Sequence, residues 1–304
     1  MNLAPAERRQ FAWITVGAIA VFAALRLLPT GTNLSHMDFR VDPRAGNVIE
    51  FCDPANPQFI PVVAAKSPVK MTVALGQGAA PGAPGVATVR LATTNGKPLR
   101  VQDLLVTHTE RLHLLIVDPA LRDYQHVHPT PTGEPGEWRF TFTPRRGGTY
   151  RFFSDFTPAA TGRGLYASAD HDIASRTGTD EGALAPGLET VQDGHRFTLG
   201  IAPQPARAGR PIDLQFAITR SEGGAVPLQP VMDAYAHLVA FDEARSGFAH
   251  LHPVEADLAK PPAATNPVLN FKLTIPRPGR YIVWAQVNLG GKETFVPFGL
   301  SVAE

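Results

Sequence analysis

An internal repeat constrains this chain more than any other feature, because it fixes both the number of domains and their relationship. The two copies are offset by 124 residues and align without a gap through their histidines. The first copy reads His108-x4-His113-x12-His126-x-His128-Pro129, and the second reads Met232-x4-His237-x12-His250-x-His252-Pro253. Further on, Gly148-Thr-Tyr150 matches Gly279-Arg-Tyr281 at an offset of 131, so the second copy has a longer loop. We therefore expect two domains of one fold.

Each copy has the pattern of a β-domain. The 304 residues include 29 prolines and 27 glycines, and only 18% are charged, which is typical of short strands joined by many turns. Apolar or β-branched runs predict seven strands per copy, near 69–75, 86–93, 112–117, 124–128, 137–143, 148–156 and 164–171, and again near 196–201, 212–219, 235–241, 248–252, 268–275, 280–288 and 293–302. The fold class is therefore all-β, with two tandem immunoglobulin-like or cupredoxin-like β-sandwiches after an N-terminal membrane helix.

The same reading gives the domain limits. It assigns residues 1–10 to a cytoplasmic tail, 11–29 to a transmembrane anchor and 30–66 to a linker with a hairpin near 36–63. The first sandwich then covers 67–172, a second linker covers 173–190, and the second sandwich covers 191–304. The role of Cys52, the single cysteine, is open, and a lone cysteine forms no internal disulfide.

The N-terminus predicts the location of the protein. Arg8 and Arg9 precede an apolar run from Phe11 to Leu28. The positively charged N-terminal end of this run is therefore expected to stay in the cytoplasm. A cleaved signal peptide is the alternative, but no small-x-small cleavage site follows the run. We expect a single-pass protein of the cytoplasmic membrane whose bulk lies outside, in the periplasm.

The histidines are the candidate site. Seven of the ten lie in the repeated arrays, and the pair His126 and His128, like the pair in the second copy, occupies one face of a strand. A hairpin can bring the earlier histidine of each copy opposite its pair. Three imidazoles then converge, as in copper and zinc sites. The expected ligands are His113, His126 and His128 in one copy and His237, His250 and His252 in the other.

The position shared by His108 and Met232 favours copper. Histidine and methionine differ in size and polarity, but both can bind copper. Residues five apart on an unbroken strand face opposite sides, so either residue can join its triplet only through a bulge or loop. Copper is therefore the expected metal, with zinc as the alternative, and we expect the two triplets to lie in separate cores that share no ligands.

Other functions compete with metal binding. In one alternative the histidines only pack beneath a loop, and the sandwiches are a structural module that docks on another membrane protein. Blue-copper electron transfer is disfavoured, because the only cysteine lies outside both copies. We find no nucleophile–base pair and no nucleotide motif, so no enzyme is expected. The formal charge of +1, without long runs of one sign, excludes a nucleic-acid footprint.

The two histidine motifs also carry a resemblance. The segments Leu112–Pro129 and Met232–Pro253, with the Pro276-Arg-Pro-Gly-Arg-Tyr281 turn, resemble bacterial exported sandwich proteins related to YtkA-like domains. The resemblance covers roughly residues 67–304 and implies a cupredoxin-like or immunoglobulin-like fold and an association with copper, but no defined activity. The first copy departs from the pattern at Asp155 and in the long tail after Phe156.

Overall fold

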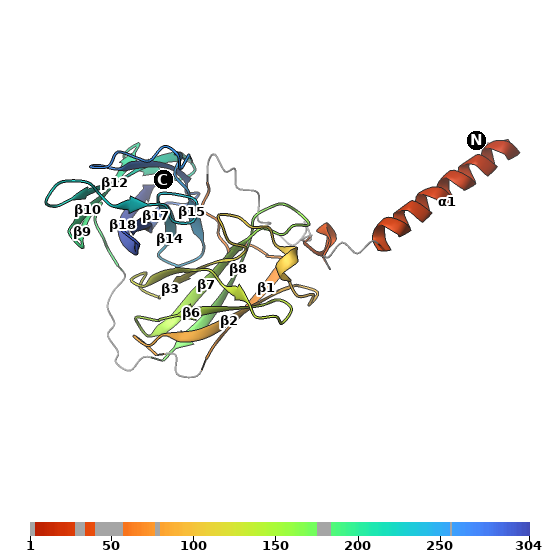
Figure 1. Ribbon diagram of the computed structural model, residues 1–304, viewed down its shortest axis with the longest axis horizontal. Coiled ribbons are helices and arrows are strands. Elements are labelled where there is room, and N and C mark those ends of the chain that lie inside the picture. Colours follow the sequence, from red (N-terminus) through yellow and green to blue (C-terminus); the bar gives the residue numbers. More distant parts are fainter. Residues whose placement is uncertain (1–3, 28–33, 40–56, 77–79, 175–183, 256) are drawn as a thin grey trace. The chain divides into compact units, whose positions relative to one another are not determined.

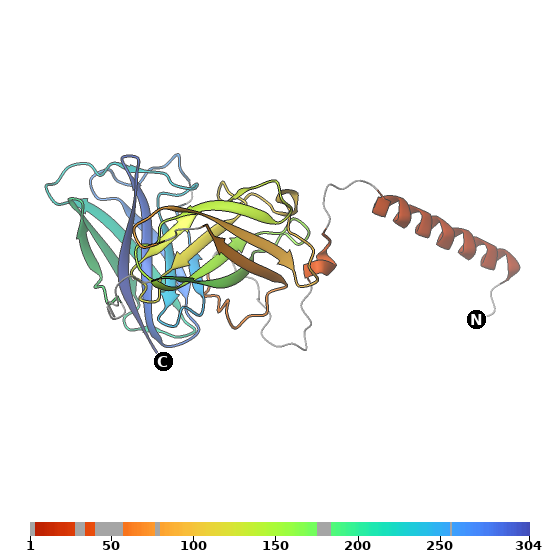
Figure 2. The ribbon, with the colours of Figure 1, turned by 90° about the horizontal axis from the view of Figure 1, so that it is seen from below.

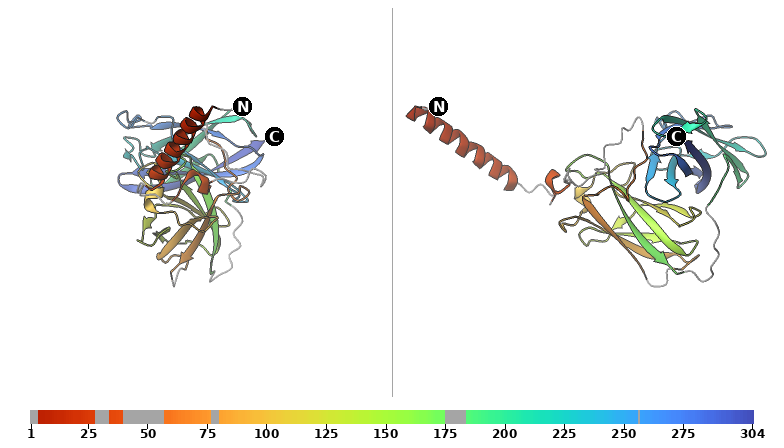
Figure 3. Two further views of the ribbon diagram at one scale, coloured as in Figure 1. Left: turned by 90° about the vertical axis from the view of Figure 1, so that its right-hand side faces the viewer. Right: turned by 180° about the vertical axis from the view of Figure 1, so that it is seen from behind.

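The computed structural model describes residues 4–27, 34–39, 57–76, 80–174, 184–255 and 257–304. It divides into two compact units, residues 1–33 and residues 34–304. The first unit holds one unbroken helix, α1 (Pro5–Leu27), shown in red in Figure 3. Its large apolar side chains are exposed, namely Phe11, Trp13, Ile14, Val16, Ile19, Val21, Phe22 and Leu25.

The structure does not confirm the membrane anchor. Within the described part of the chain, no helix combines the length and the hydropathy needed to cross a membrane. The anchor over 11–29 therefore stays a prediction. Cys52 and most of the hairpin expected near 36–63 lie outside the described residues.

The first sandwich, orange to green in Figure 1, consists of two four-stranded sheets. The outer sheet has the order β1-β2-β6-β5, and the inner sheet has the order β4-β3-β7-β8. The strands are β1 (Val69–Leu75), β2 (Gly85–Thr93), β3 (His113–Val117), β4 (Tyr124–Val127), β5 (Thr130–Pro131), β6 (Glu137–Phe142), β7 (Gly148–Phe156) and β8 (Leu165–Ile173), with short 3-10 turns η1 (His36–Phe39) and η3 (Val101–Asp103).

The second sandwich, cyan to blue in Figure 2, repeats this plan. Its outer sheet has the order β16-β12-β10-β9, and its inner sheet has the order β11-β18-β17-β14-β15, with β13 paired to β17. The strands are β9 (Glu189–Gln192), β10 (His195–Ala202), β11 (Ala206–Arg207), β12 (Pro211–Arg220), β13 (Leu228–Gln229), β14 (His237–Asp242), β15 (Phe248–Leu251), β16 (Val268–Thr274), β17 (Gly279–Leu289) and β18 (Lys292–Ala303).

The longer strands of the two sandwiches follow the same order in their sheets. The series β4-β3-β7-β8 in the first sandwich corresponds to β15-β14-β17-β18 in the second, and β1-β2-β6 corresponds to β10-β12-β16. The predicted fold class, all-β with two tandem sandwiches, is confirmed. The short strands β5, β9, β11 and β13 were not expected, because two to four residues carry too little periodicity to be recognised.

The inner sheets of the two sandwiches pack against each other. Residues of β3 alternate, so that Leu114 and Ile116 enter the core of the first sandwich while Leu115 and Val117 face outward. The outward residues join those of the second sandwich in one buried apolar cluster: Ile60, Val62, Leu115, Val117, Leu121, Tyr124, Phe153, Val239, Phe241, Phe248, Ile282 and Trp284. Both faces of β3 and β14 are therefore covered, which explains their nearly continuous apolar sequences.

A segment before the first sandwich binds the second. Ile60 exchanges backbone hydrogen bonds with Phe248, at 2.8 and 3.1 Å, and Phe59 lies in the second core against Tyr281. Residues 57–63, which the sequence interpretation placed in a linker, thus pair with edge strands of both sheets of the second sandwich, Gln58 with Thr274 of β16 and Ile60 with Phe248 of β15. The close approach requires Gly247, because a Cβ there would overlap the carbonyl of Ile60.

Replacement of Gly247 by alanine should therefore displace this segment. We expect Gly247→Ala to lower the free energy of unfolding by about 1–3 kcal/mol, the usual cost of forcing atoms into a packed site. Gly200→Ala is the matched control, since its added Cβ would meet only ordinary contacts at 3.5 Å or more. Thermal denaturation of the two variants measures the difference, and equal melting temperatures would contradict the assigned role of Gly247.

A candidate metal centre between the two sandwiches

The strands place the histidines on the faces that meet between the sandwiches. His113 opens β3 on the same face as Leu115, and His126 lies on β4 on the same face as Tyr124. The same alternation in β14 and β15 puts His237 and His250 on the facing sheet. Imidazoles therefore form one end of an interface whose middle is apolar.

The first triplet converges as the sequence predicted. The ring centroids of His113, His126 and His128 lie 4.9–5.5 Å apart. One nitrogen from each ring lies within 4.8 Å of the other two. A three-histidine metal site needs nitrogens roughly 3.4 Å apart at metal–nitrogen distances of 2.0–2.1 Å, so a small rotation of the rings would close the triplet.

The second triplet has nearly the same dimensions. The ring centroids of His237, His250 and His252 lie 4.8–5.5 Å apart, and their nitrogens also fall within 4.8 Å of one another. Because the two triplets come from corresponding positions of the two copies, this agreement reflects the shared strand geometry.

Hydrogen bonds orient the rings of the first triplet. Nε2 of His113 lies 3.0 Å from the carbonyl of Thr107, and Nδ1 of His126 lies 2.8 Å from Oε1 of Gln286. Both oxygens can only accept, so each of these nitrogens carries the hydrogen in a neutral ring. The other two nitrogens, Nδ1 of His113 and Nε2 of His126, are then bare and face each other at 3.3 Å.

The second triplet is oriented in the same way. Nε2 of His237 donates to the carbonyl of Val231 at 3.0 Å, and Nδ1 of His250 donates to Oδ2 of Asp155 at 3.2 Å. The remaining nitrogens, Nδ1 of His237 and Nε2 of His250 and His252, are buried without a hydrogen-bond partner. The same is true of Nε2 of His128 in the first triplet. Buried polar atoms without partners are rare and often mark an ion-binding site.

The expectation that the triplets lie in separate cores is wrong. The ring of His126 lies 5.3 Å from that of His250 and 6.3 Å from that of His237, and His113 lies 6.0 Å from His250. The sequence could not show this, because the packing of one sandwich on the other brings the triplets together. Each triplet still takes its own three histidines from one sandwich.

His108 and Met232 occupy tight turns rather than strand positions. His108 and Thr109 have φ values of 49° and 71°, and Met232 and Asp233 have φ values of 48° and 58°. Each pair makes a two-residue turn that is closed by a β-bridge between the flanking residues. These turns are the loops that the sequence analysis required for either residue to join its triplet.

The ring of His108 contacts the opposite triplet. It stacks on His252 of the second sandwich at 3.8 Å, while its centroid lies 6.5 Å from that of His113. His108 therefore sits beside the triplet of the other copy, and the part that His108 and Met232 play as ligands stays a prediction.

Burial keeps the imidazoles neutral. Desolvation is the main cause that lowers the pKa of His237 to about 4, and it holds the pKa values of His126 and His250 well below their usual range. The neighbouring rings lower these values further, since protonating one ring disfavours protonating the next. Burial also raises the pKa of Asp155, and the neighbouring imidazole of His113 opposes this shift.

A cavity of about 680 Å³ opens onto both triplets. Its lining includes His113 from the first, His250 and His252 from the second, and the Asp155 carboxylate, with Tyr166 among its apolar walls. An ion bound by three histidines in either triplet would keep one coordination position for water or another ligand, as open metal sites do.

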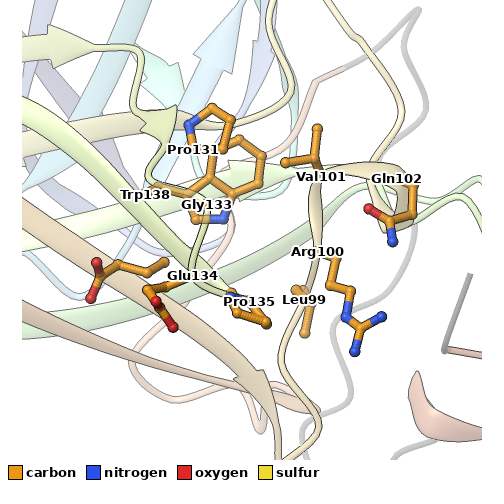
Figure 4. Close-up of a pocket in the computed structure, with 11 residues that line it drawn as sticks. Leu99, Arg100, Val101, Gln102, Pro131, Gly133, Glu134, Pro135 and Trp138 are labelled. Carbon is orange, nitrogen blue, oxygen red and sulfur yellow. The ribbon is translucent and has the colours of Figure 1, made fainter.

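A smaller hollow of about 350 Å³ lies on the first sandwich. Figure 4 shows Arg100 and Gln102 on one side of it and Glu134 on the other, around the indole of Trp138. No histidine lines this hollow, and Figure 4 shows its charged groups apart rather than converging. It therefore offers no comparable site.

Two residues that hydrogen-bond the triplets were not predicted from the sequence. Asp155 lies opposite His113 in the β3–β7 pairing, and Gln286 lies opposite His237 in the β14–β17 pairing. They correspond at the offset of 131 that aligns Tyr150 with Tyr281, so the repeat contained the signal. Their roles were hidden because each bonds a histidine of the other copy.

Comparisons with known proteins identify a family and little more. The family described as "Domain of unknown function (DUF8832)" matches residues 66–169 and 189–304. No curated protein matches the chain.

The solved structures that match are distant. They include an engineered protein (17% identity, TM-score 0.23, covering 36% of this chain and 21% of that one) and invasin, a bacterial integrin-binding protein (13%, 0.23, 76% and 39%). A third is Escherichia coli alpha-2-macroglobulin activated by porcine elastase (11%, 0.24, 79% and 22%). The chain spans less than half the length of each of these proteins.

The buried neutral histidines predict that the metal-free protein is labile to acid. The pKa of His237 falls from about 6.5 in the unfolded chain to about 4 in the fold, so the unfolded state binds more protons between these values. The contribution of neutral His237 to the free energy of unfolding is fully present above pH 6.5. It is lost as the pH falls toward 4, and the loss is on the order of 3 kcal/mol for this residue alone.

Denaturant unfolding of the metal-free chain at several pH values measures this loss. His237→Gln should lose less stability between pH 7 and pH 4.5 than the wild type, while His195→Ala, at the start of β10 and outside the site, should follow the wild type. A wild-type stability that does not change over this range would contradict the buried neutral state.

Proposed function

Because this chain belongs to the family described as "Domain of unknown function (DUF8832)", whose description assigns no activity, we propose a function from its site: metal binding, with copper as the first candidate. The observation that carries the proposal is the set of buried imidazole nitrogens that converge in each triplet, all three of the second without a hydrogen-bond partner, and in the first His128 Nε2 without one and those of His113 and His126 facing only each other. The ions would be held by His113, His126 and His128 and by His237, His250 and His252.

The energetics of the metal-free triplets support this role. A buried polar atom without a partner costs about 1–3 kcal/mol, and four such nitrogens lie in the two triplets. The bare nitrogens of His113 and His126, 3.3 Å apart, also direct their lone pairs toward each other. A cation between the nitrogens of a triplet would remove both costs. Ligand histidines are typically held by a hydrogen bond at their other nitrogen, as His113, His126, His237 and His250 are here.

The donor set favours copper or zinc over the hard cations. Neutral imidazole suits copper and zinc, whereas Ca²⁺ and Mg²⁺ prefer oxygen ligands, and neither triplet contains a carboxylate. The soft thioether of Met232, in the turn that corresponds to that of His108, is the reason to place copper before zinc. Binding or buffering of the metal needs no further chemistry, so we propose no enzymatic activity.

We further propose that the protein works outside the cytoplasmic membrane, held there by α1. Eight large apolar side chains of this helix are exposed along its length. An apolar surface of that extent is typical of a segment that contacts a membrane or another protein. Arg8 and Arg9 on its N-terminal side favour an inward-facing N-terminus.

Copper titration of the purified full chain tests the proposal. We expect two copper ions per chain, one per triplet. Replacing His126 and His128 by alanine should remove one ion, and replacing His250 and His252 should remove the other. The double variant His171→Ala/His195→Ala, whose residues lie outside both triplets, serves as the control and should keep both ions.

Metal analysis after dialysis gives the count. If the wild type binds no more copper or zinc than the chain that lacks all six histidines, the metal proposal fails. The remaining function would then be a sandwich module that docks on another membrane protein.

The turn position distinguishes copper from zinc. We expect Met232→Leu to weaken Cu(I) binding by about tenfold while leaving the fold intact, because a similar apolar side chain replaces a soft ligand and usually costs less than about 1.5 kcal/mol. Competition with a Cu(I) chelator measures the affinity, and the melting temperature reports the fold. An unchanged Cu(I) affinity would exclude Met232 as a ligand and leave zinc equally supported.

A further inference from the structure

We infer that the two triplets form a single two-metal centre with unequal sites, in which Asp155 and Gln286 are positioning residues that each serve the triplet of the other sandwich. This inference rests on the proposed metal binding and extends it. It concerns which residues orient the ligands, which triplet fills first, and why the two do not act independently.

The support for the ligands is exchanged across the interface. Asp155 belongs to β7 of the first sandwich, yet its carboxylate accepts the Nδ1 hydrogen of His250 in the second, at 3.2 Å. Gln286 belongs to β17 of the second sandwich, yet its Oε1 accepts the Nδ1 hydrogen of His126 in the first, at 2.8 Å. Each triplet thus depends on the opposite sandwich for the orientation of one ring.

The strand register makes this exchange a consequence of the fold. Asp155 lies beside His113 in its own sheet, and Gln286 lies beside His237 in its own sheet. All four side chains point outward from their sheets, so they meet the facing sandwich rather than their own core. The exchange would be lost if the two sandwiches separated.

The triplets are also close enough to influence each other. The rings of His126 and His250, which belong to different triplets, lie 5.3 Å apart in a buried region. Two cations held in adjoining triplets would repel each other, and a buried site screens that repulsion weakly. Binding of one ion should therefore weaken binding of the second.

The two supports differ in charge. Asp155 is the one carboxylate that is hydrogen-bonded to a triplet histidine among the residues that the structure describes. Gln286 is neutral and only 1% exposed, and its orientation is fixed because its Nε2 donates to Oε2 of Glu293 at 2.9 Å. A carboxylate that accepts the ring N–H makes the imidazole a stronger metal ligand than an amide does. It also compensates the positive charge of the bound ion. The triplet of His237, His250 and His252 should therefore take a divalent ion first.

Variants that keep one triplet at a time test the exchange. In the full chain, His128→Ala leaves the second triplet intact, and His252→Ala leaves the first. Into each background we place Asp155→Asn, which removes the charge, or Gln286→Leu, which removes the acceptor. Equilibrium titration with Zn²⁺, which has no redox chemistry, measures the affinity of the remaining triplet.

We expect a crossed pattern. Asp155→Asn, in the first sandwich, should weaken the triplet of the second by about 10–100-fold and leave the triplet of the first within a few fold. Gln286→Leu should do the reverse. Asp155→Glu, which restores the charge, should recover part of the loss. Substitutions that weaken only the triplet of their own sandwich, or both triplets equally, would overturn the inference.

The order of filling has its own readout. In ¹⁵N spectra of the wild type, the first equivalent of Zn²⁺ should shift the ring nitrogens of His237, His250 and His252 before those of the other triplet, and Asp155→Asn should abolish this order. Simultaneous filling in the wild type would overturn the inequality. If neither single-triplet background binds Zn²⁺ or copper, the proposed function itself fails, which is a different result from binding without the crossed pattern.

Discussion

The packing of one inner sheet on the other is the constraint on which the rest of this structure depends. Strands β3 and β14 are buried on both faces, one toward the core of their own sandwich and one toward the facing sandwich. Apolar side chains such as Leu115 and Phe241 fill the middle of the interface. Their burial stabilises the packing of the two sheets by roughly 25 cal/mol per Å² of apolar area. The histidines at the ends of the same strands are buried as a result.

The ends of this interface are polar in different ways. At the end away from the histidines, Arg151 donates to the carbonyl of Arg245, at 2.8 Å, and Arg245 donates to the carbonyl of Thr149, at 2.7 Å. There each guanidinium donates to a carbonyl oxygen of the facing sandwich. At the histidine end the rings find oxygens on one side only, and their inner nitrogens remain bare. Tyr124 Oη and Trp284 Nε1 of the same interface are also buried without a partner, but only in the triplets do several such nitrogens converge on one point among the residues that the structure describes.

The sequence predicted much of the fold because most of its strands are regular apolar runs bounded by clear turn residues. The runs at 69–75 and 148–156 agree with β1 and β7 residue for residue, and His126 lies on β4 as expected, although β4 ends one residue before His128. The repeat then predicted that the second copy would build the same triplet. Local periodicity is sufficient for these conclusions, since each depends on residues within one sandwich.

What the sequence could not predict depends on contacts between the copies. The partnership of Asp155 with His250 joins residues 95 positions apart, and that of His126 with Gln286 joins residues 160 apart. The stacking of His108 on His252 has the same origin. Spacing within a motif carries no information on how two finished sandwiches pack, so these contacts became visible only in three dimensions.

The difference between Asp155 and Gln286 has a consequence for how such a centre can exist at all. The two sandwiches face each other as the halves of a twofold-symmetric dimer would, with each half supporting the other. In a dimer of identical chains the two positions would have to carry the same residue, because one patch meets its own copy. When both halves belong to one polypeptide, the two positions can carry different residues. A charged residue can then support one triplet and a neutral residue the other, which a homodimer cannot achieve.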